Sequence, residues 1–168
     1  GASAQIVAVD VAAAGASEEI LARGMDRFGR VDVVFANAGY GTRGPVEIVP
    51  VELIRKNFET NIFSLIALTQ LVVPHMRERG SGCIVNIGSV VGKNAGNARA
   101  WLDPAELERA GNVAYGVSKA GVHMMTGFLA KELASFGITV NAVCPGYVLT
   151  PLVQKQVDAR AQALGLSN

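Results

Sequence analysis

The sequence predicts a single α/β domain built on a parallel β-sheet, and three observations support this. Short apolar runs rich in β-branched residues alternate four times with longer stretches in which apolar residues recur at helical spacing. Such alternation is typical of parallel sheets whose strands are joined by right-handed helical crossovers. The length of 168 residues suits one domain, and no repeat or linker divides the chain. We therefore treat residues 1–168 as one folding unit.

The first half of the chain predicts two strands and two helices. Residues 5–11 are expected to form a strand, followed by a helix over about 17–28 that Ser17 caps. Residues 31–36 are almost all apolar, as expected for a strand in a sheet that is covered on both faces. A Gly-rich loop then leads to a long helix over about 51–79, whose apolar residues recur at helical spacing.

The second half predicts two more strands and two more helices. Residues 83–88 form the third expected strand, and residues 138–143 form the fourth. Between them a helix is expected over about 113–136, and Gly137 suits its C-terminal end. A last helix is expected to run to about residue 164.

Composition excludes several classes of protein. Apolar residues make up 50% of the chain and charged residues only 17%, a balance that excludes intrinsic disorder. The 15 basic and 14 acidic residues leave a net charge of +1 and no basic stripe, so we expect no nucleic-acid partner. Polar residues interrupt the longest apolar run, which is shorter than the roughly 20 residues of a membrane span. Cys83 and Cys144 lie in apolar segments without metal-ligand spacing, which predicts buried free thiols, no metal site and a reducing cytoplasm.

The strongest chemical signal is a tyrosine and a lysine four residues apart. Tyr115 and Lys119 fall at the start of the helix expected over 113–136, so they lie on one helical face. A nearby ammonium favours the phenolate form of tyrosine, which would make Tyr115 a usable acid or base near neutral pH. Because this spacing also arises by chance, the pair needs support from other positions.

Further polar groups follow the predicted strands at one edge of the sheet, where parallel sheets bind ligands. They are Ser89, the run Asn37-Ala38-Gly39 and the run from Pro145-Gly146 to Thr150. Each has a structural alternative, since serine, Asn-Ala-Gly and Pro-Gly also suit turns and helix caps. Asn61 lies among apolar residues of a helix, where a buried amide needs hydrogen-bond partners. Its role is equally open to a structural or a functional interpretation.

Together, and in this order, these residues closely resemble the motifs of the classical short-chain dehydrogenase/reductase family. The resemblance covers essentially the whole chain and implies a Rossmann-type, doubly wound parallel sheet. It implies that Tyr115 is the general acid/base, that Lys119 tunes it and that Ser89 polarises the substrate oxygen. Asn61 would hold a water in the proton relay through Lys119. The residues implied to bind the dinucleotide are Asp10, Val11, Asn37, Ala38, Gly39, Tyr115, Lys119, Pro145, Gly146, Val148 and Thr150.

The resemblance implies reversible oxidation of a secondary alcohol to a ketone with NAD or NADP, with a slight preference for NAD. The implied partners are a small alcohol or ketone and further copies of the chain. A homodimer or homotetramer would form through the helices over 51–79 and 113–136. Two alternatives remain open: a non-catalytic NAD(P)-sensing or scaffold protein, and an acyl-transfer hydrolase. The hydrolase would need a Gly-x-Ser-x-Gly elbow, which Gly88-Ser89 lacks, and could use only His75 or His123 as its base.

The chain departs from the family at its beginning. The family's glycine-rich Thr-Gly-x-x-x-Gly-x-Gly turn and its second strand have no counterpart here. We therefore expect a chain truncated at the N-terminus and at the C-terminus. The strand over 5–11 should then be detached from that over 31–36 or pair with it directly, and NAD(H) binding should be weaker than in an intact enzyme.

Two segments bear on the substrate. The 25 residues between Ser89 and Tyr115 exceed the family's usual spacing, so we expect an insertion over about 93–112, with a short helix possible at 104–110. With Arg99 and Trp101 it could be a lid or binding loop, or a surface excursion. Residues 150–156, including Gln156, resemble D-3-hydroxybutyrate dehydrogenases, whereas residues 86–92 resemble 3-oxoacyl-thioester reductases. The substrate is therefore left open.

Overall fold

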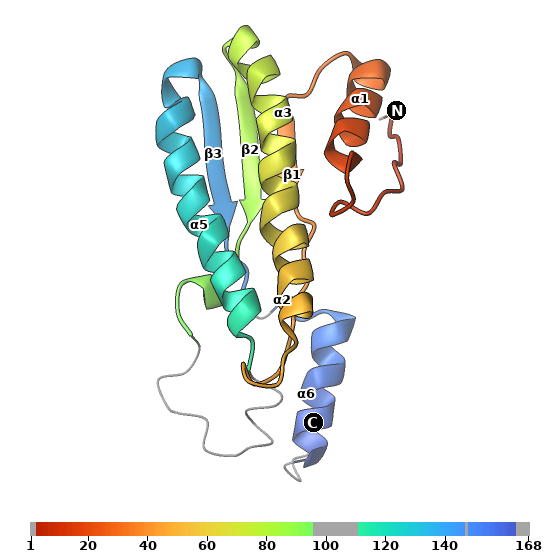
Figure 1. Cartoon of the computed structure of the whole chain (residues 1–168), viewed down its shortest axis with the longest axis vertical. Coiled ribbons are helices and arrows are strands. Elements are labelled where there is room, and N and C mark those ends of the chain that lie inside the picture. The colour runs from red at the N-terminus through yellow and green to blue at the C-terminus, as the bar shows by residue number, and fades with distance from the viewer. Residues whose placement is uncertain (1–2, 96–110, 147, 164–168) are drawn as a thin grey trace.

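The computed structural model describes residues 3–95, 111–146 and 148–163, which contain a three-stranded parallel sheet (Figure 1). The strands β1 (Val33–Ala36), β2 (Gly82–Ile87) and β3 (Ile138–Val143) lie in that order across the sheet. Val34 of β1 is opposite Ile84 of β2, which is opposite Val140 of β3. All neighbouring strands are parallel, so the carboxyl ends of all three strands meet at one edge, which confirms the predicted α/β class.

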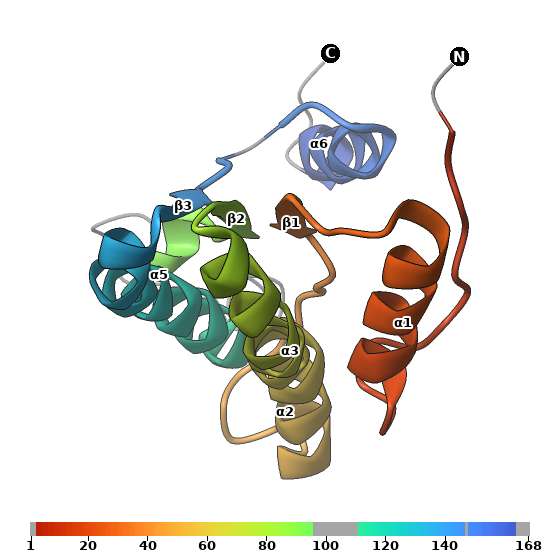
Figure 2. The ribbon, with the colours of Figure 1, turned by 90° about the horizontal axis from the view of Figure 1, so that it is seen from above.

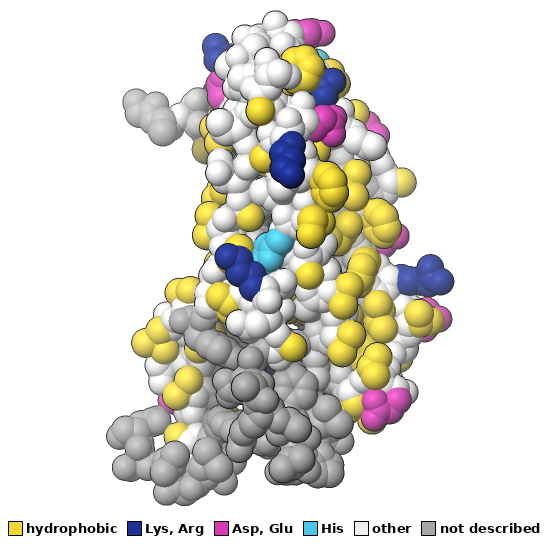
Figure 3. Space-filling view, turned by 90° about the vertical axis from the view of Figure 1, so that its left-hand side faces the viewer, with side chains coloured by type: hydrophobic (Ala, Val, Ile, Leu, Met, Phe, Trp, Pro, Cys, Tyr) yellow, Lys and Arg dark blue, Asp and Glu magenta, His cyan; other side chains and the backbone are white. Residues whose placement is uncertain are grey.

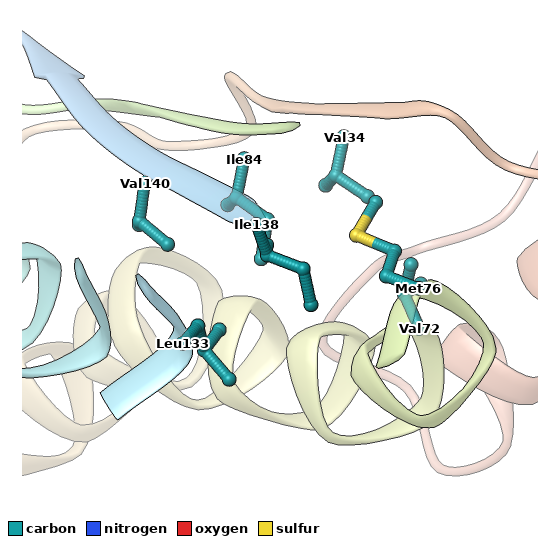
Figure 4. Packing of buried hydrophobic residues seen from close by; sticks show 7 residues of the cluster. All are labelled: Val34, Val72, Met76, Ile84, Leu133, Ile138 and Val140. Atoms are coloured by element: carbon teal, nitrogen blue, oxygen red, sulfur yellow. The ribbon is translucent and has the colours of Figure 1, made fainter. Parts of the chain in front are cut away.

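Three helices cover one face of this sheet, as Figure 2 shows from above. They are α2 (Val51–Phe58), α3 (Ser64–Arg79) and α5 (Val113–Leu133). Because side chains alternate between the two faces of a strand, every second strand residue points toward these helices. The resulting core joins strand residues to α3 and α5 (Figure 4). Its buried members are Val34, Val72, Met76, Ile84, Leu133, Ile138 and Val140.

The other described helices lie outside this layer. Helix α1 (Ala16–Phe28) packs against α3 beyond the β1 edge, and α6 (Pro151–Ala163) lies past the carboxyl ends of the strands (Figures 1 and 2). The opposite face of β1 is open within the described residues, where Val33 is 56% and Phe35 62% exposed. The apolar run over 31–36 therefore has one covered face in this structure, whereas its composition predicts two.

The predicted strand over residues 5–11 is wrong. Residues 3–10 have no regular secondary structure, and Ile6 is 92% exposed. The segment runs along the outer side of α1, detached from β1 (Figure 2). An apolar, β-branched run forms a strand only where a neighbouring strand can satisfy its backbone groups, and this segment has none beside it.

Two helices differ in detail from their predictions. Ser17 does not cap α1, because the helix begins at Ala16 after Gly15, whose φ of 80° is left-handed, and Ser17 is buried in the first turn. The predicted continuous helix over 51–79 contains a π-helical turn, Glu59–Phe63, between α2 and α3. The helix after residue 113 continues through the 3-10 turn Ala134–Phe136 to Gly137 (φ 68°), as predicted.

Apolar side chains also remain exposed on the helices. Figure 3 shows them on the side of the molecule that carries α5. The exposed apolar residues of the π turn and α5 include Phe63, Val113, Val117, Met124 and Phe128. None of the described helices is both long and apolar enough to span a bilayer.

Candidate active site

Lys119 lies at the centre of a polar cluster beside the carboxyl end of β2. Lys119 belongs to α5 and is 5% exposed. Its Nζ donates a hydrogen bond to the Ile87 carbonyl oxygen at 2.7 Å. A Cβ atom on Gly39, in the loop after β1, would lie 3.3 Å from this Nζ. The missing side chain at Gly39 thus lets the β1 loop approach the lysine closely. Burial lowers the pKa of Lys119 from its usual value.

Asn61 ties the β1 loop to the helices. It lies in the π-helical turn and is 3% exposed. Its Oδ1 accepts the Tyr40 backbone N–H at 3.0 Å, and its Nδ2 donates to the Tyr40 carbonyl and to Ser118 Oγ, each at 3.0 Å. A π turn is common at functional sites, and this one places an amide where three elements meet. The amide therefore helps to hold the loop after β1 next to α5 and Lys119.

Tyr115 lies one turn before Lys119 on α5, as the sequence predicts. Lys119 Nζ is 5.7 Å from the centroid of the Tyr115 ring. A Cβ atom on Gly41 would lie 3.7 Å from Tyr115 Cγ, so the loop after β1 passes against the tyrosine as well. The half-buried phenol and the buried ammonium thus occupy one face of α5, beside the same loop.

Ser89 follows β2 and is 8% exposed. Its Oγ accepts the Val91 backbone N–H at 3.3 Å and so caps the short 3-10 turn Val90–Gly92. Its own backbone N–H donates to Nε2 of His123 at 3.2 Å. The serine therefore has the capping role that its sequence context allowed, and its hydroxyl oxygen lies at the same sheet edge as Ile87.

The loop after β3 joins this edge through the backbone. The Pro145 carbonyl accepts the Val90 N–H at 3.1 Å, which places Pro145-Gly146 beside the turn that follows Ser89. Val148 and Thr150 are exposed, and Thr150 Oγ1 accepts the Val153 N–H at 3.3 Å at the start of α6. Asn37 and Ala38 are exposed in the loop after β1, directly before Gly39.

Some predicted residues are not brought to this edge. Asp10 and Val11 belong to the segment outside α1, where Asp10 Oδ1 accepts the Ala12 N–H at 3.0 Å, so their role in dinucleotide binding stays a prediction (Figure 2). Arg99, Trp101 and the helix expected at 104–110 lie outside the described residues, as does the side chain of Gln156.

The structure also adds residues that the sequence did not single out. Asn57 donates from Nδ2 to the Tyr40 carbonyl at 2.7 Å and is fully buried one turn before Asn61. Ser118 Oγ accepts a hydrogen bond from Asn61 Nδ2 and donates one to the Tyr115 carbonyl oxygen at 2.8 Å. His123 contacts Ser89 and was considered in the sequence only as a hydrolase base. Asn57 lies four residues before Asn61, and His123 lies four residues after Lys119. Because residues four apart share one face of a helix, this spacing could have indicated both from the sequence.

This arrangement suits proton transfer at a substrate oxygen better than acyl transfer. A phenol, an ammonium and a hydroxyl gather at the ligand-binding edge of a parallel sheet. His123 Nε2 faces the backbone N–H of Ser89, with the hydroxyl bonded to Val91, which disfavours a serine hydrolase. Within the described residues, no group of three His, Cys, Asp or Glu side chains could hold a metal ion.

The chain is similar to a known protein family and to curated sequences. A family model described as enoyl-(acyl carrier protein) reductase matches residues 1–165. A D-beta-hydroxybutyrate dehydrogenase of Rhizobium meliloti is 34% identical over 149 residues, covering 89% of this chain and 53% of the relative. The 3-oxoacyl-[acyl-carrier-protein] reductase FabG of Thermotoga maritima is 36% identical over 148 residues, covering 88% and 55%. The chain thus spans about half the length of the curated relatives it matches.

Solved structures share the fold at similar coverage. ElxO with NADP bound is 29% identical, with a TM-score of 0.75, and the match covers 90% of this chain and 56% of that one. An NAD+-bound xylitol dehydrogenase is 28% identical, with a TM-score of 0.74, and the match covers 91% and 55%. Both forms of the nicotinamide dinucleotide are therefore found among structural neighbours of this chain.

Proposed function

Because the chain belongs to the short-chain dehydrogenase/reductase family, we propose that its protein interconverts a secondary alcohol and a ketone with a nicotinamide dinucleotide. The observation that carries this proposal is the position of Lys119. Its buried Nζ is bonded to Ile87 at the end of β2, next to Gly39 and 5.7 Å from the Tyr115 ring. A lysine with a purely structural role would not require the phenol of Tyr115 and the glycine at position 39 as its neighbours.

The residues fit a dinucleotide. The absence of a side chain at Gly39 brings the loop backbone close to the site, since a Cβ atom there would lie only 3.1 Å from Asn61 Oδ1 and 3.3 Å from Lys119 Nζ. Ligand hydroxyl groups beside this loop would meet one cation and the exposed backbone of the β1 loop. Asn37, Ala38, Gly39, Lys119 and the loop through Pro145-Gly146 would hold the nucleotide, and Val148, Thr150, Asp10 and Val11 are further contacts implied by the family resemblance. NAD is the cofactor we expect, with NADP as the tested alternative.

The chain's own residues would then handle the proton. A bound nicotinamide dinucleotide would supply or accept the hydride at the carbon atom. Tyr115 gives its phenolic proton to the carbonyl oxygen in reduction and takes it back in oxidation. Lys119 favours the phenolate through its charge, Ser89 polarises the substrate oxygen, and Asn61 holds the β1 loop and a relay water near Lys119.

The names of two relatives suggest a class of substrate. Relatives named D-beta-hydroxybutyrate dehydrogenase and 3-oxoacyl-[acyl-carrier-protein] reductase act on oxygen at the third carbon of an acyl chain, so we propose a 3-hydroxy or 3-oxo acyl compound. Cys83 and Cys144 are free and half-buried, where burial was predicted, and free thiols suit a reducing cytoplasm.

A panel of alcohols and ketones, each tested with NAD and NADP on the full-length protein, tests the proposal. We expect turnover of at least one 3-oxo or 3-hydroxy compound, followed by nicotinamide absorbance. Nucleotide binding without turnover across the panel would instead favour the non-catalytic sensing or scaffold alternative.

A further inference from the structure

The ring of His123 lies between two glycines, Gly88 after β2 and Gly92 in the 3-10 turn Val90–Gly92. A Cβ atom on Gly88 would collide with Nε2, and one on Gly92 would lie 2.9 Å from Cε1. Neither glycine has the positive φ for which glycine is usually needed, so the space they leave is the feature that distinguishes them. The half-buried imidazole therefore fills a volume that a side chain at either position would take.

The hydrogen bonds fix the state of the ring. The Ser89 backbone N–H, which can only donate, points to Nε2 at 3.2 Å. Nε2 must then offer its lone pair, so the ring is neutral and its proton lies on Nδ1. The ring also hydrogen-bonds the backbone of Gly92, an interaction that favours a protonated ring nitrogen. Cys144 Sγ, at the end of β3, lies 3.1 Å from the same Nε2 and brings a second weak donor.

We propose that His123 is a positioning residue, whose neutral ring holds the backbone of Ser89 and so aims the serine hydroxyl at the substrate. The inference rests on the proposed function for the role of the hydroxyl, but the hydrogen bond itself does not. When His123 is protonated, an N–H at Nε2 faces the N–H of Ser89, and the bond is lost. Activity should then fall on the acid side because Ser89 is released, while nucleotide binding is retained.

The charges around the ring agree with a neutral imidazole. Burial lowers the pKa of His123 below its usual value, and the positive charges of Lys93 and Lys119 lower it further. Lys119 lies one turn earlier on α5, Lys93 follows the turn Val90–Gly92, and Cys144 faces the ring from the end of β3. The hydrogen bond to Gly92 acts in the opposite direction and is the smallest of these influences. Protonation should therefore occur below about pH 6.5, the usual value for histidine.

Two substitutions separate the hydrogen bond from the shape of the ring. His123→Gln can place a carboxamide oxygen near the position of Nε2 and accept from Ser89 without titrating. His123→Leu fills much of the space of the ring but cannot accept. The chain's other histidine, His75 on α3, gives the matched control His75→Gln, which should behave as the parent.

In full-length protein we expect His123→Leu to lower kcat about tenfold, or about 1.4 kcal/mol, near neutral pH, with the KM for the nucleotide little changed. This difference from the parent should shrink at acid pH, where protonation of His123 breaks the same hydrogen bond in the parent. His123→Gln should keep kcat near neutral pH and lose the parent's fall in activity on the acid side. Should His123→Leu fold poorly, His123→Gln alone still decides whether the acid limb belongs to this histidine. A His123→Gln variant with the parent's acid limb would overturn the proposal.

A readout independent of turnover separates this inference from the proposed function. With isotope-labelled serine, the Ser89 amide proton should shift as the pH is lowered, with the midpoint at which His123 titrates, and this step should vanish in His123→Gln. If the chemical shift of the Ser89 amide proton does not change when His123 is protonated, the proposal is overturned even in an active enzyme. If no compound in the panel is turned over but this shift is seen, the proposed function fails and the His123–Ser89 bond stands.

Discussion

At the scale of single residues, Lys119 shows how one side chain can serve two tasks. Its Nζ is bonded to the Ile87 carbonyl, lies 5.7 Å from the Tyr115 ring and would meet any side chain on Gly39. It therefore borders both the phenol that would move the proton and the space proposed for the nucleotide. A charge in this position costs folding energy, since burial lowers the pKa of Lys119.

Lys119→Ala should weaken catalysis and nucleotide binding together. Loss of the ammonium removes the cation beside Tyr115 and the donor beside Gly39, so we expect kcat to fall by about two orders of magnitude or more. The nucleotide Kd should rise about tenfold, as expected for one lost charge-assisted hydrogen bond. Steady-state kinetics and fluorescence titration with the nucleotide measure the two effects. An unchanged Kd would remove Lys119 from the binding site.

His123 should also make stability depend on pH. Because its pKa in the folded protein is lowered, the unfolded chain takes up the proton at a higher pH than the folded one does. The free energy of unfolding should therefore decrease as the pH falls from about 6.5, the usual pKa of histidine, toward the lower pKa of His123 in the folded protein. This part of the decrease should be absent in His123→Gln. Urea unfolding at several pH values measures it. Parallel pH curves for parent and variant would show that the folded protein does not disfavour protonation here.

At this scale the sequence predicted chemistry better than contacts. Tyr115 and Lys119 lie on one helical turn, so their spacing alone indicated that they would approach each other. The partners of Asn61 could not be predicted, because Tyr40 and Ser118 come from two other elements. The bond from Ser89 to His123 joins residues 34 apart in sequence, and local periodicity carries no information about such a contact.

At the scale of elements, the site depends on close packing between α5 and its neighbours. The turn Val90–Gly92 packs on α5, and the π turn packs against the same helix. The π turn was not predicted, since the apolar spacing over 51–79 suits a continuous helix, and one extra residue in a turn barely changes that pattern. The strand over 5–11 was predicted wrongly, because a strand also needs a neighbour that composition cannot reveal.

Two glycines near or in α5 give opposite predictions for alanine. A Cβ atom on Gly92 would lie 2.6 Å from the Lys119 carbonyl carbon, so Gly92→Ala should lower the free energy of unfolding by about 1–3 kcal/mol. A Cβ atom on Gly127, within α5, would meet nothing within 4 Å, so Gly127→Ala should raise it by about 0.5–1 kcal/mol through helix propensity. Urea unfolding measures both. Stabilisation by Gly92→Ala would contradict the close contact between the turn and α5.

At the scale of the whole molecule, exposed apolar side chains on the helices indicate self-association. Met124 and Phe128 on α5 are 65% and 67% exposed, and Phe63 in the π turn is 51% exposed. We expect the full-length protein to form a homodimer or homotetramer through these helices, as the sequence predicts. Light scattering at micromolar concentration measures this. A monomer alone would refute it, and Phe128→Glu should shift an oligomer toward smaller species.

The parallel pairing of the strands and the helices that connect them were predicted from alternation, whereas alternation alone does not fix the order of the strands. The apolar run over 31–36 predicted cover on both faces of β1, but a run of residue types does not say which segment supplies that cover, and no described residue covers the second face. Phe35, 62% exposed on that face, illustrates the difference.

The central claim is that the polar edge of this sheet transfers a proton to a substrate oxygen through Tyr115. The most direct test compares the parent with Tyr115→Phe in full-length protein, using the ketone that the panel identifies and the preferred nucleotide. Turnover should fall by about two to four orders of magnitude, because only the phenolic hydroxyl is removed. Nucleotide binding by fluorescence titration should stay nearly unchanged. A Tyr115→Phe variant that turns over within a few-fold of the parent would contradict the account.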